Sequence, residues 1–361
     1  MSNFRPCPGT LLRFSLHYSC VDIKAIAYEL PSHVLTSEDI EERLAPLYQK
    51  LHIRPGQLEA LTGVKERRQW ERGMPLSEGA IAAGRKALDL AAMKPEDIDM
   101  LIYGAVCREN LEPATACAVA CGLGLPDHAH LFDLSNACLG MMNGLLLIAD
   151  AIESGRIRRG MVVACESSRQ IMDITMDAML AQPTMASFTK GLATLTGGSG
   201  AAAIVLGRKD EGNRGHALLG SVLKNKHACH DLCVWGPDTG IPASAPMAMR
   251  TDAAAVLRHG VELGRETFQL FLEETGMGEK DLDRIICHQV GAAHRETILS
   301  AMGIPMEKDY ATFPFLGNMG TVSLPITAAA AFEQGFLQPG HRVGFFGIGS
   351  GLNCLLLGLD W

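Results

Sequence analysis

The feature that most limits what this chain can fold into is an internal repeat. Residues 92–102 (AMKPEDIDMLI) match residues 276–286 (GMGEKDLDRII), with both aspartates in register. Residues 198–207 (GSGAAAIVLG) resemble residues 349–358 (GSGLNCLLLG). Because the two matches follow the same order along the chain, the sequence predicts a duplicated α/β unit.

The 361 residues divide into three predicted parts. Residues 1–20 have no clear hydrophobic period, and we expect them to form a loose N-terminal extension. The polar segment 209–215 separates the two repeats, which predicts a first half over 21–212 and a second half over 213–361. Helical patterns alternate with apolar strands in both halves, which favours an α/β fold with two buried, mostly parallel central sheets.

Composition argues against several classes of function. Charged residues make up 20% of the chain and the formal net charge is −8, so nucleic-acid binding has no general electrostatic support. No run of about 18 uncharged apolar residues is present, so we expect no membrane span. The 11 cysteines are odd in number and lie mainly in apolar runs, which favours reduced thiols and a cytoplasmic protein. Their spacing lacks the four-ligand pattern of a zinc site, and we expect no metal.

The stretch 131–155 carries the first candidate for chemistry. Residues 131–135 are typical of a short buried strand, and residues 139–152 of a helix that is apolar on nearly every face. Cys138 then lies at or just before the N-terminus of a buried helix, where unpaired amide groups favour a thiolate nucleophile. The alternative is a buried cysteine that acts as a small hydrophobe.

The second half supplies two further candidates. His288 follows the apolar strand 284–287 and would project from the carboxyl end of that strand, where ligands bind in α/β sheets. Asn318 stands in a glycine-flanked turn before an alanine-rich helix, and glycines there let the backbone come close to a ligand. Taken separately, each has an ordinary structural interpretation, as a hydrogen-bonded core histidine and a left-handed turn residue.

Five short motifs combine these candidates with their surroundings. They are 62–68 (TGVKERR), 136–140 (NACLG), 288–289 (HQ), 317–320 (GNMG, with Ser323 and Pro325 after it) and 347–351 (GIGSG). With them, the chain resembles the thiolase superfamily, in the β-ketoacyl synthase III branch of condensing enzymes. The resemblance extends from about Val21 to Trp361.

The resemblance implies a duplicated, five-layered αβαβα fold, a homodimer and an active site at the end of a buried acyl channel. It implies that Cys138 is the acylated nucleophile, while His288 and Asn318 bind the thioester carbonyl of a second substrate. The amides of Cys138 and Ser350 would hold the oxyanion of the acylation step. The expected activity is that of an acyltransferase that forms a carbon–carbon bond by Claisen condensation, with thioester substrates and no cofactor.

Glu112 bears on how the carbon nucleophile forms. The segment 111–116 (LEPATA) falls where many ketoacyl synthases place an aromatic residue that crosses the dimer interface into the partner's pocket. Here it resembles the olefin-biosynthesis thiolases, which join two fatty acyl-CoA molecules without decarboxylation. A carboxylate in an apolar pocket has a raised pKa, so Glu112 would serve as the base for a proton on carbon. The alternative is an interface or helix-start glutamate.

The thioester carrier is left open by the sequence. Leu61 and roughly Gln57 stand where many bacterial relatives have the arginine and tryptophan that hold the adenine of CoA. An acidic acyl carrier protein is therefore a second possible donor, with a basic landing patch at 156–159 or 65–68. Alternative functions are a decarboxylating 3-oxoacyl synthase III that uses malonyl-ACP, a relative that acylates an oxygen or nitrogen acceptor, and a non-catalytic scaffold.

Two further segments are assigned from composition. The methionine-rich segment 172–185 is a candidate lining for the acyl channel, because methionine adapts to flexible alkyl chains, and a core role is the alternative. Residues 225–250 hold histidines and cysteines at irregular spacing, which favours a surface or substrate-facing loop over a metal cluster.

Overall fold

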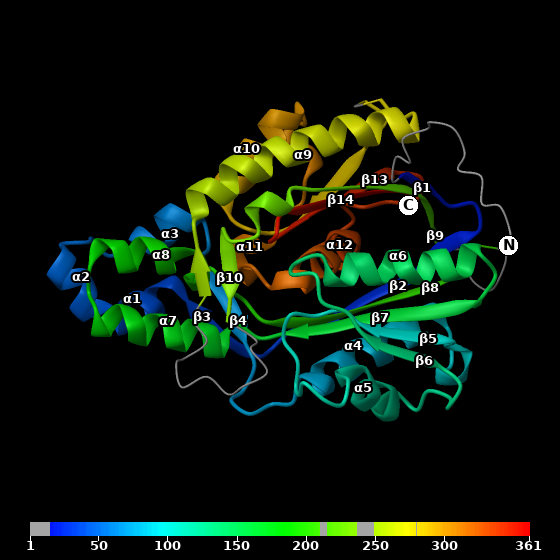
Figure 1. Ribbon diagram of the computed structural model, residues 1–361, viewed down its shortest axis with the longest axis horizontal. Coiled ribbons are helices and arrows are strands. Elements are labelled where there is room, and N and C mark those ends of the chain that lie inside the picture. The colour runs from blue at the N-terminus through cyan, green and yellow to red at the C-terminus, as the bar shows by residue number, and fades with distance from the viewer. Residues whose placement is uncertain (1–14, 210–214, 237–248, 279) are drawn as a thin grey trace, which may run out of the picture.

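A computed structural model describes residues 15–209, 215–236, 249–278 and 280–361 of the chain. Figure 1 shows five layers in the order αβαβα: α9 and α10, strands that include β13 and β14, the central α6 and α12, strands that include β2, β7 and β8, and then α4 and α5. The predicted five-layered fold is therefore confirmed. The ten strands of the large sheet are β1 (Ser15–His17), β2 (Val21–Glu29), β5 (Met100–Tyr103), β6 (His130–Asp133), β7 (Arg159–Glu166), β8 (Gly200–Arg208), β9 (His216–Asn225), β12 (Arg284–Cys287), β13 (Arg342–Gly349) and β14 (Asn353–Asp360).

Helices cover both faces of these strands. The α-helices are α1 (Ser37–Arg43), α2 (Ala45–Leu51), α3 (Gln57–Thr62), α4 (Leu76–Ala91), α5 (Thr115–Leu123), α6 (Gly140–Glu153), α7 (Arg169–Ala181), α8 (Met185–Leu195), α9 (Ala253–Thr275), α10 (Ala292–Met302), α11 (Phe313–Leu316) and α12 (Ser323–Glu333). Short 3-10 turns are η1 (Pro95–Asp97), η2 (His227–Cys229), η3 (Met306–Lys308) and η4 (Gly320–Val322). Two small hairpins complete the described elements: β3 (His33–Thr36) with β4 (Glu66–Gln69), and β10 (Cys233–Trp235) with β11 (Met249–Thr251).

The strand order repeats within the large sheet. The first group runs β6-β5-β7-β8-β2 and the second runs β12-β13-β14-β9, so β5, β7, β8 and β2 correspond to β12, β13, β14 and β9. A single parallel bridge between Ile285 and Asp309 stands where β6 pairs with β5 in the first group. This repeated order confirms the duplication that the internal sequence matches predict.

The expected strand directions were wrong in part. β5 pairs in parallel with β6 and β7, and β12 with β13, but the other ladders of the large sheet are antiparallel. A two-residue ladder between β2 and β9 also joins the two groups into one continuous sheet instead of two separate ones. The sequence could not reveal this, because a strand covered on both faces is a continuous apolar run whichever way its neighbour points.

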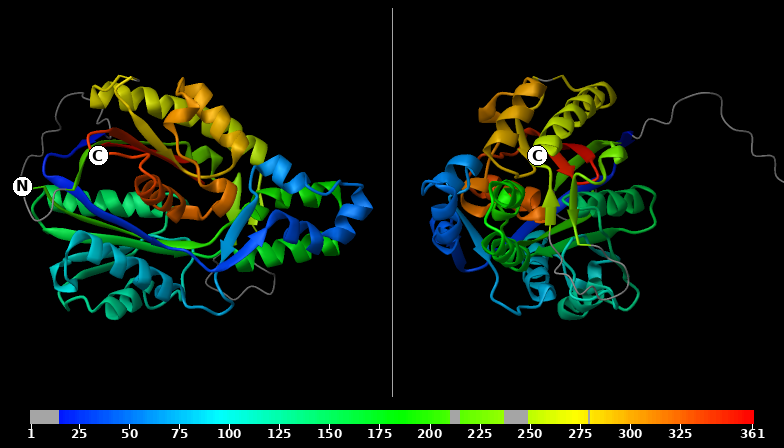
Figure 2. Two further views of the ribbon diagram at one scale, coloured as in Figure 1. Left: turned by 180° about the vertical axis from the view of Figure 1, so that it is seen from behind. Right: turned by 60° about the vertical axis from the view of Figure 1, so that its left-hand side comes forward.

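A lobe lies beside the layers (Figures 1 and 2) and consists of helices α1, α2, α3, α7 and α8 with the hairpin of β3 and β4. Thr36 caps α1 through a capping box with Asp39, and α2 begins at Ala45 directly after Leu44. The methionine-rich segment forms α7 and the start of α8, and Met172, Met176 and Met179 are buried in a core cluster with residues of α1 and α2. Its role as channel lining is not supported, and the core interpretation is correct for these three methionines.

The structure describes the ends of the two predicted halves only in part. Residues 15–17 form β1, which pairs antiparallel with β9, so this part of the predicted loose extension belongs to the sheet. The boundary predicted at residues 212 and 213 lies outside the described residues and stays a prediction. Within the described residues, no helix is long and apolar enough to cross a membrane.

Candidate active site

Cys138 lies in the turn between β6 and α6, two residues before the helix begins at Gly140. The preceding Ala137 has a left-handed backbone with φ of 47°. Gly140 lets α6 approach the end of β5, because a Cβ there would lie 2.5 Å from the carbonyl oxygen of Gly104. The predicted position of Cys138, just before the N-terminus of a buried helix, is therefore correct.

The ionisation of Cys138 differs from the thiolate that the sequence predicts. Burial first, then the Glu166 carboxylate and Cys233, together raise the pKa of the Cys138 thiol to about 12. Glu166 is itself buried, and its oxygens accept hydrogen bonds from the amides of Val106 (2.9 Å) and Cys107 (3.1 Å). Desolvation thus outweighs the helix N-terminus, so the resting residue is a thiol and not the predicted thiolate.

His288 directly follows β12, as the sequence predicts. Its backbone amide donates to the carbonyl of Phe346 at 2.9 Å, which fixes it to the neighbouring strand β13. Burial lowers the pKa of the imidazole to about 4, with a smaller effect from His294, so His288 is neutral near pH 7. Its Nδ1 is buried without a hydrogen-bond partner in the described part of the chain. A neutral imidazole in this position can donate from one ring nitrogen and accept at the other.

Asn318 is held by its own backbone and side chain. Its amide donates to the Thr196 carbonyl (2.9 Å), and its carbonyl accepts from the Gly198 amide (2.8 Å). Its side-chain oxygen Oδ1 accepts from the Gly320 amide at 3.0 Å, which assigns the Nδ2 group as the free donor. Gly317 (φ 67°) allows this turn, because a Cβ there would lie 2.4 Å from the Thr196 oxygen. The glycine-flanked pattern therefore fixes a side-chain donor.

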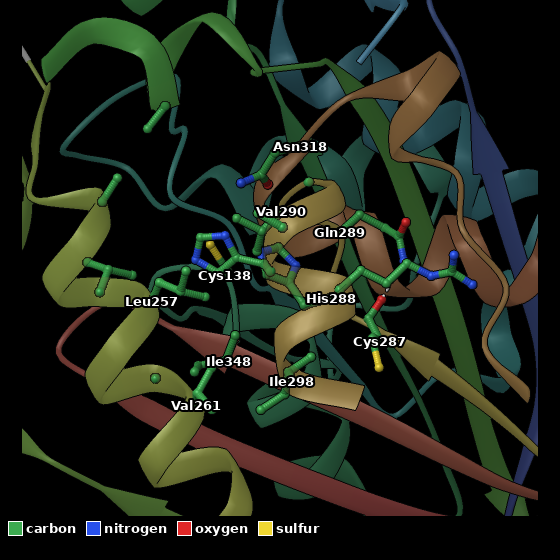
Figure 3. A pocket seen from close by; sticks show the side chains of 18 of the residues that line it. Cys138, Leu257, Val261, Cys287, His288, Gln289, Val290, Ile298, Asn318 and Ile348 are labelled. Carbon is green, nitrogen blue, oxygen red and sulfur yellow. Dashed lines mark hydrogen bonds between the residues drawn. The ribbon is translucent and has the colours of Figure 1, made fainter. Parts of the chain in front are cut away.

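These side chains meet in one cavity of about 430 Å³, shown in Figure 3. Cys138, His288, Asn318 and Ser350 all line it, although they come from four separate segments of the chain. Glu112 does not line it: the side chain is exposed in this chain. The structure thus brings together four of the five predicted residues and leaves the fifth outside the cavity of its own chain.

Residues that the sequence did not single out organise the Cys138 turn. Asn353 donates from Nδ2 to the Ser350 carbonyl (3.0 Å) and to the Asn136 side-chain oxygen (3.3 Å). Asn136 in turn donates to Asn143 at 2.7 Å. A Cβ on Gly349 would lie 3.5 Å from the Cys138 amide, so these two backbone segments are in contact. The link from Asn353 to Asn136 was hidden in the sequence because the two residues are 217 positions apart.

Arg67 of the 62–68 motif supports the Asn318 turn, while the alternative landing patch at 156–159 stays a prediction. Arg67 is fully buried and donates to the Ser37 hydroxyl (3.0 Å) and the Leu195 carbonyl (2.9 Å), next to Thr196. The Lys65 amide donates to the Pro314 carbonyl at 2.8 Å. The expectation that Arg67 forms part of a surface landing patch is therefore wrong, because a buried guanidinium cannot meet a partner protein.

The described residues contain no group of three or more histidine, cysteine, aspartate or glutamate side chains that could hold a metal ion. His227 and Cys229 lie in η2, His230 directly follows it, and Cys233 of β10 lines the cavity. Of the predicted loop, Cys233 faces this cavity. Residues 237–248 of the same segment lie outside the described residues.

The layered, duplicated fold and the cysteine-containing cavity define a thiolase-fold acyltransferase. Two family models match: "3-Oxoacyl-[acyl-carrier-protein (ACP)] synthase III" over residues 132–226 and its C-terminal counterpart over residues 272–361. An acyl-CoA:acyl-CoA alkyltransferase of Shewanella oneidensis is 50% identical over 349 residues, which are 96% of this chain and 100% of that protein. An enzyme of the same name from Xanthomonas campestris is 34% identical over 94% of this chain and 98% of its own length.

A solved structure gives the same result. The Xanthomonas campestris OleA with bound lauric acid and lauroyl-CoA, a cysteine-to-serine variant, superposes with a TM-score of 0.89 at 34% identity, and covers 95% of this chain and 100% of that one. The chain therefore belongs to the 3-oxoacyl-[acyl-carrier-protein] synthase III family, and it is an acyltransferase.

Proposed function

We propose that this protein joins two fatty acyl-CoA molecules by a Claisen condensation without decarboxylation, through an acyl thioester on Cys138. The observation that carries the proposal is the cavity in which Cys138, His288 and Asn318 meet next to a lining of apolar side chains. Such a lining suits an alkyl chain, and the three polar groups suit the thioester at its end. The names of the two relatives, and the lauroyl-CoA bound to the related structure, support the choice of substrate.

The first step in this proposal is acylation of a neutral thiol. Because burial keeps Cys138 protonated and His288 neutral, the proton leaves Cys138 as the thiol attacks, and His288 is the acceptor in the same cavity. The oxyanion is held by the amides of Cys138 and Ser350. The CoA sulfur leaves and takes the proton back from His288 as CoA thiol. His288 is then neutral again and free to donate a hydrogen bond.

The second step forms the carbon–carbon bond. The thioester carbonyl of a second acyl-CoA accepts hydrogen bonds from His288 and from Nδ2 of Asn318, which lowers the pKa of its α-carbon. Glu112 of a second copy removes this proton, and the enolate carbon attacks the acyl group on Cys138. The bond to Cys138 breaks, and the released thiolate takes the proton from Glu112. The products are a β-ketoacyl-CoA and one free CoA.

A homodimer is part of this proposal, because Glu112 needs a cavity other than its own. β6 is an edge strand of the large sheet, and apolar side chains beside it are exposed: Phe132 on the strand by 49% and Leu111 next to Glu112 by 80%. An exposed edge strand with apolar side chains favours pairing with a second copy. We expect the pairing to carry residues 111 and 112 to the partner. A cytoplasmic location remains an expectation from the cysteines.

The test uses intact-protein mass and product analysis with myristoyl-CoA, with and without malonyl-CoA. We expect an acyl adduct on wild type that is absent in Cys138→Ala, and a long β-keto product without malonyl-CoA. Glu112→Gln should keep the adduct and lose the product. A product that forms only with malonyl-CoA would identify a decarboxylating synthase instead, and an adduct that forms only from acyl-ACP would identify the carrier protein as donor.

A further inference from the structure

One helix supplies a continuous side of the active-site cavity. Along α9, the residues Ala253, Leu257, Gly260, Val261 and Gly264 all line it, and their spacing of three or four places them on one helical face. The opposite side consists of side chains from α10, β13 and β14, and Figure 3 shows Leu257, Val261, Ile298 and Ile348 around the space. These lining residues are Ile298, Met302, Phe346, Ile348, Cys354 and Leu356.

The cavity is open at one end and blind at the other. Near the start of α9 and α10 its lining is exposed to solvent, at Ala254 and Ala293, and Leu61 of α3 is 51% exposed. At the far end Met302 and Leu356 are only 5% and 1% exposed. One turn beyond Gly264, Phe268 is fully buried and packs edge-on against Phe346, with ring centroids 5.6 Å apart. An apolar chain that enters from the open end therefore stops at this buried end.

Gly264 makes the closest approach at the blind end. A Cβ built on Gly264 would lie 2.6 Å from Cδ1 of Ile298 and 3.3 Å from Cε of Met302. Its backbone is ordinary helix, so a left-handed conformation does not explain the glycine. A glycine inside a helix is less favourable than alanine. The glycine allows the Ile298 side chain to lie against α9 instead of projecting further into the cavity.

We propose that the contact between Gly264 and Ile298 sets the longest acyl chain that the cavity accepts. The inference rests on the proposed acyl-CoA function, because the occupant of the cavity is taken to be the alkyl chain. A side chain at position 264 moves Ile298 into the space that the end of the alkyl chain needs. Each methylene that loses its place in an apolar pocket lowers kcat/KM by roughly 10-fold or more. Short chains, which end before Gly264, are unaffected.

The first experiment measures kcat/KM for condensation with octanoyl-CoA, myristoyl-CoA and palmitoyl-CoA. In Gly264→Ala, the palmitoyl-to-octanoyl ratio should fall roughly 10-fold relative to wild type, with the octanoyl value nearly unchanged. Ile298→Val, which removes the Cδ1 methyl that faces Gly264, should move the ratio the other way. A ratio is insensitive to the amount of folded protein, so a partial folding defect does not imitate the effect.

The double variant Gly264→Ala/Ile298→Val tests the contact most directly. Valine lacks the Cδ1 atom that a Cβ at position 264 would meet, so the double variant should regain the wild-type ratio. The matched control is Gly79→Ala in α4, a buried helical glycine that does not line the cavity. Its Cβ would lie 2.8 Å from Sγ of Cys165, so it should lose stability and keep the wild-type ratio.

Two failures can be told apart. If wild type forms no adduct with any of the acyl-CoA molecules, the proposed function fails. The length limit can then be tested alone, by measuring how much free octanoate and free palmitate raise the unfolding temperature. Gly264→Ala should lose the palmitate effect and keep the octanoate effect. An unchanged ratio and an unchanged palmitate effect in Gly264→Ala, or a double variant that behaves like Gly264→Ala, would overturn the inference.

Discussion

The two halves of this protein place a helix in the same position and use it differently. α4 covers β2 and β8, and α9 covers the corresponding β9 and β14. α4 presents a buried face of small residues, which include Gly79 and Ala83, to its strands. α9 packs against its strands near Phe268 and Phe271 but lines a cavity over its first three turns. The same topology therefore gives a closed core in one half and a binding space in the other.

The central helices show a second contrast. Cys138 precedes α6 in the first half, while Asn318 stands before η4 and α12 in the second. Burial acts on both halves of the site in the direction of the neutral form, because it raises the pKa of Cys138 and lowers that of His288. One half thus supplies a neutral thiol, which we propose is acylated, and the other supplies the neutral groups that we propose bind the second thioester.

The largest expected effect comes from removing the nucleophile of the first half. Cys138→Ala should abolish the acyl adduct and lower condensation by at least about 10³-fold, because no other group replaces a covalent nucleophile. Intact-protein mass and product formation with myristoyl-CoA measure both. An adduct of the same mass in Cys138→Ala would place the acyl group on another residue and break the proposed division of roles.

Asn318→Ala should affect only the condensation step, in which we propose that Asn318 binds the second thioester. Condensation is expected to fall by about 10²–10³-fold, as for the loss of one preorganised oxyanion donor, while the adduct on Cys138 still forms. Single-turnover acylation and steady-state condensation, measured on the same preparation, separate the two steps. Equal losses in both steps would mean that Asn318 also serves the first step.

Two glycines test the difference between closed core and cavity. Gly79→Ala in α4 should lower the free energy of unfolding by about 1–3 kcal/mol, because the new Cβ would lie 2.8 Å from Sγ of the buried Cys165. Gly260→Ala in α9 should be neutral or slightly stabilising, since its Cβ would meet only the end of one flexible side chain, Cδ1 of Ile348, at 3.0 Å. Urea unfolding of the two variants measures this. Similar losses in both would argue that α9 is as tightly packed as α4.

The last prediction concerns the pH dependence of stability. The pKa of His288 is about 4 in the folded protein, against about 6.5 in an unfolded chain. Between these values the unfolded chain binds a proton that the folded protein does not, so stability falls as the pH decreases from 6.5 to 4. His288→Gln should remove this contribution and give a shallower loss of unfolding temperature over that range. Identical slopes for wild type and variant would show that His288 is not held neutral.

Much of the site was predictable because its residues stand next to local signals. His288 follows an apolar strand, Cys138 precedes an apolar helix, and glycines surround Asn318, so each could be placed at an element end. Glu112 was predictable only as a candidate, since the role that we propose for it needs a second copy of the chain. Asn353 and Arg67 were missed as supports because their partners are far away in the sequence.

The sequence by itself determined the duplication, the element order and the candidate residues, because periodicity, capping residues and repeated motifs are local properties. It did not determine the strand directions, the protonation of Cys138 or the position of the cavity. Those depend on what surrounds each group after folding: neighbours on both sides of a strand, the water removed from a thiol, and the gap between α9 and the side chains opposite it. Only the tertiary structure decides these, because desolvation and packing are made by residues distant in the chain.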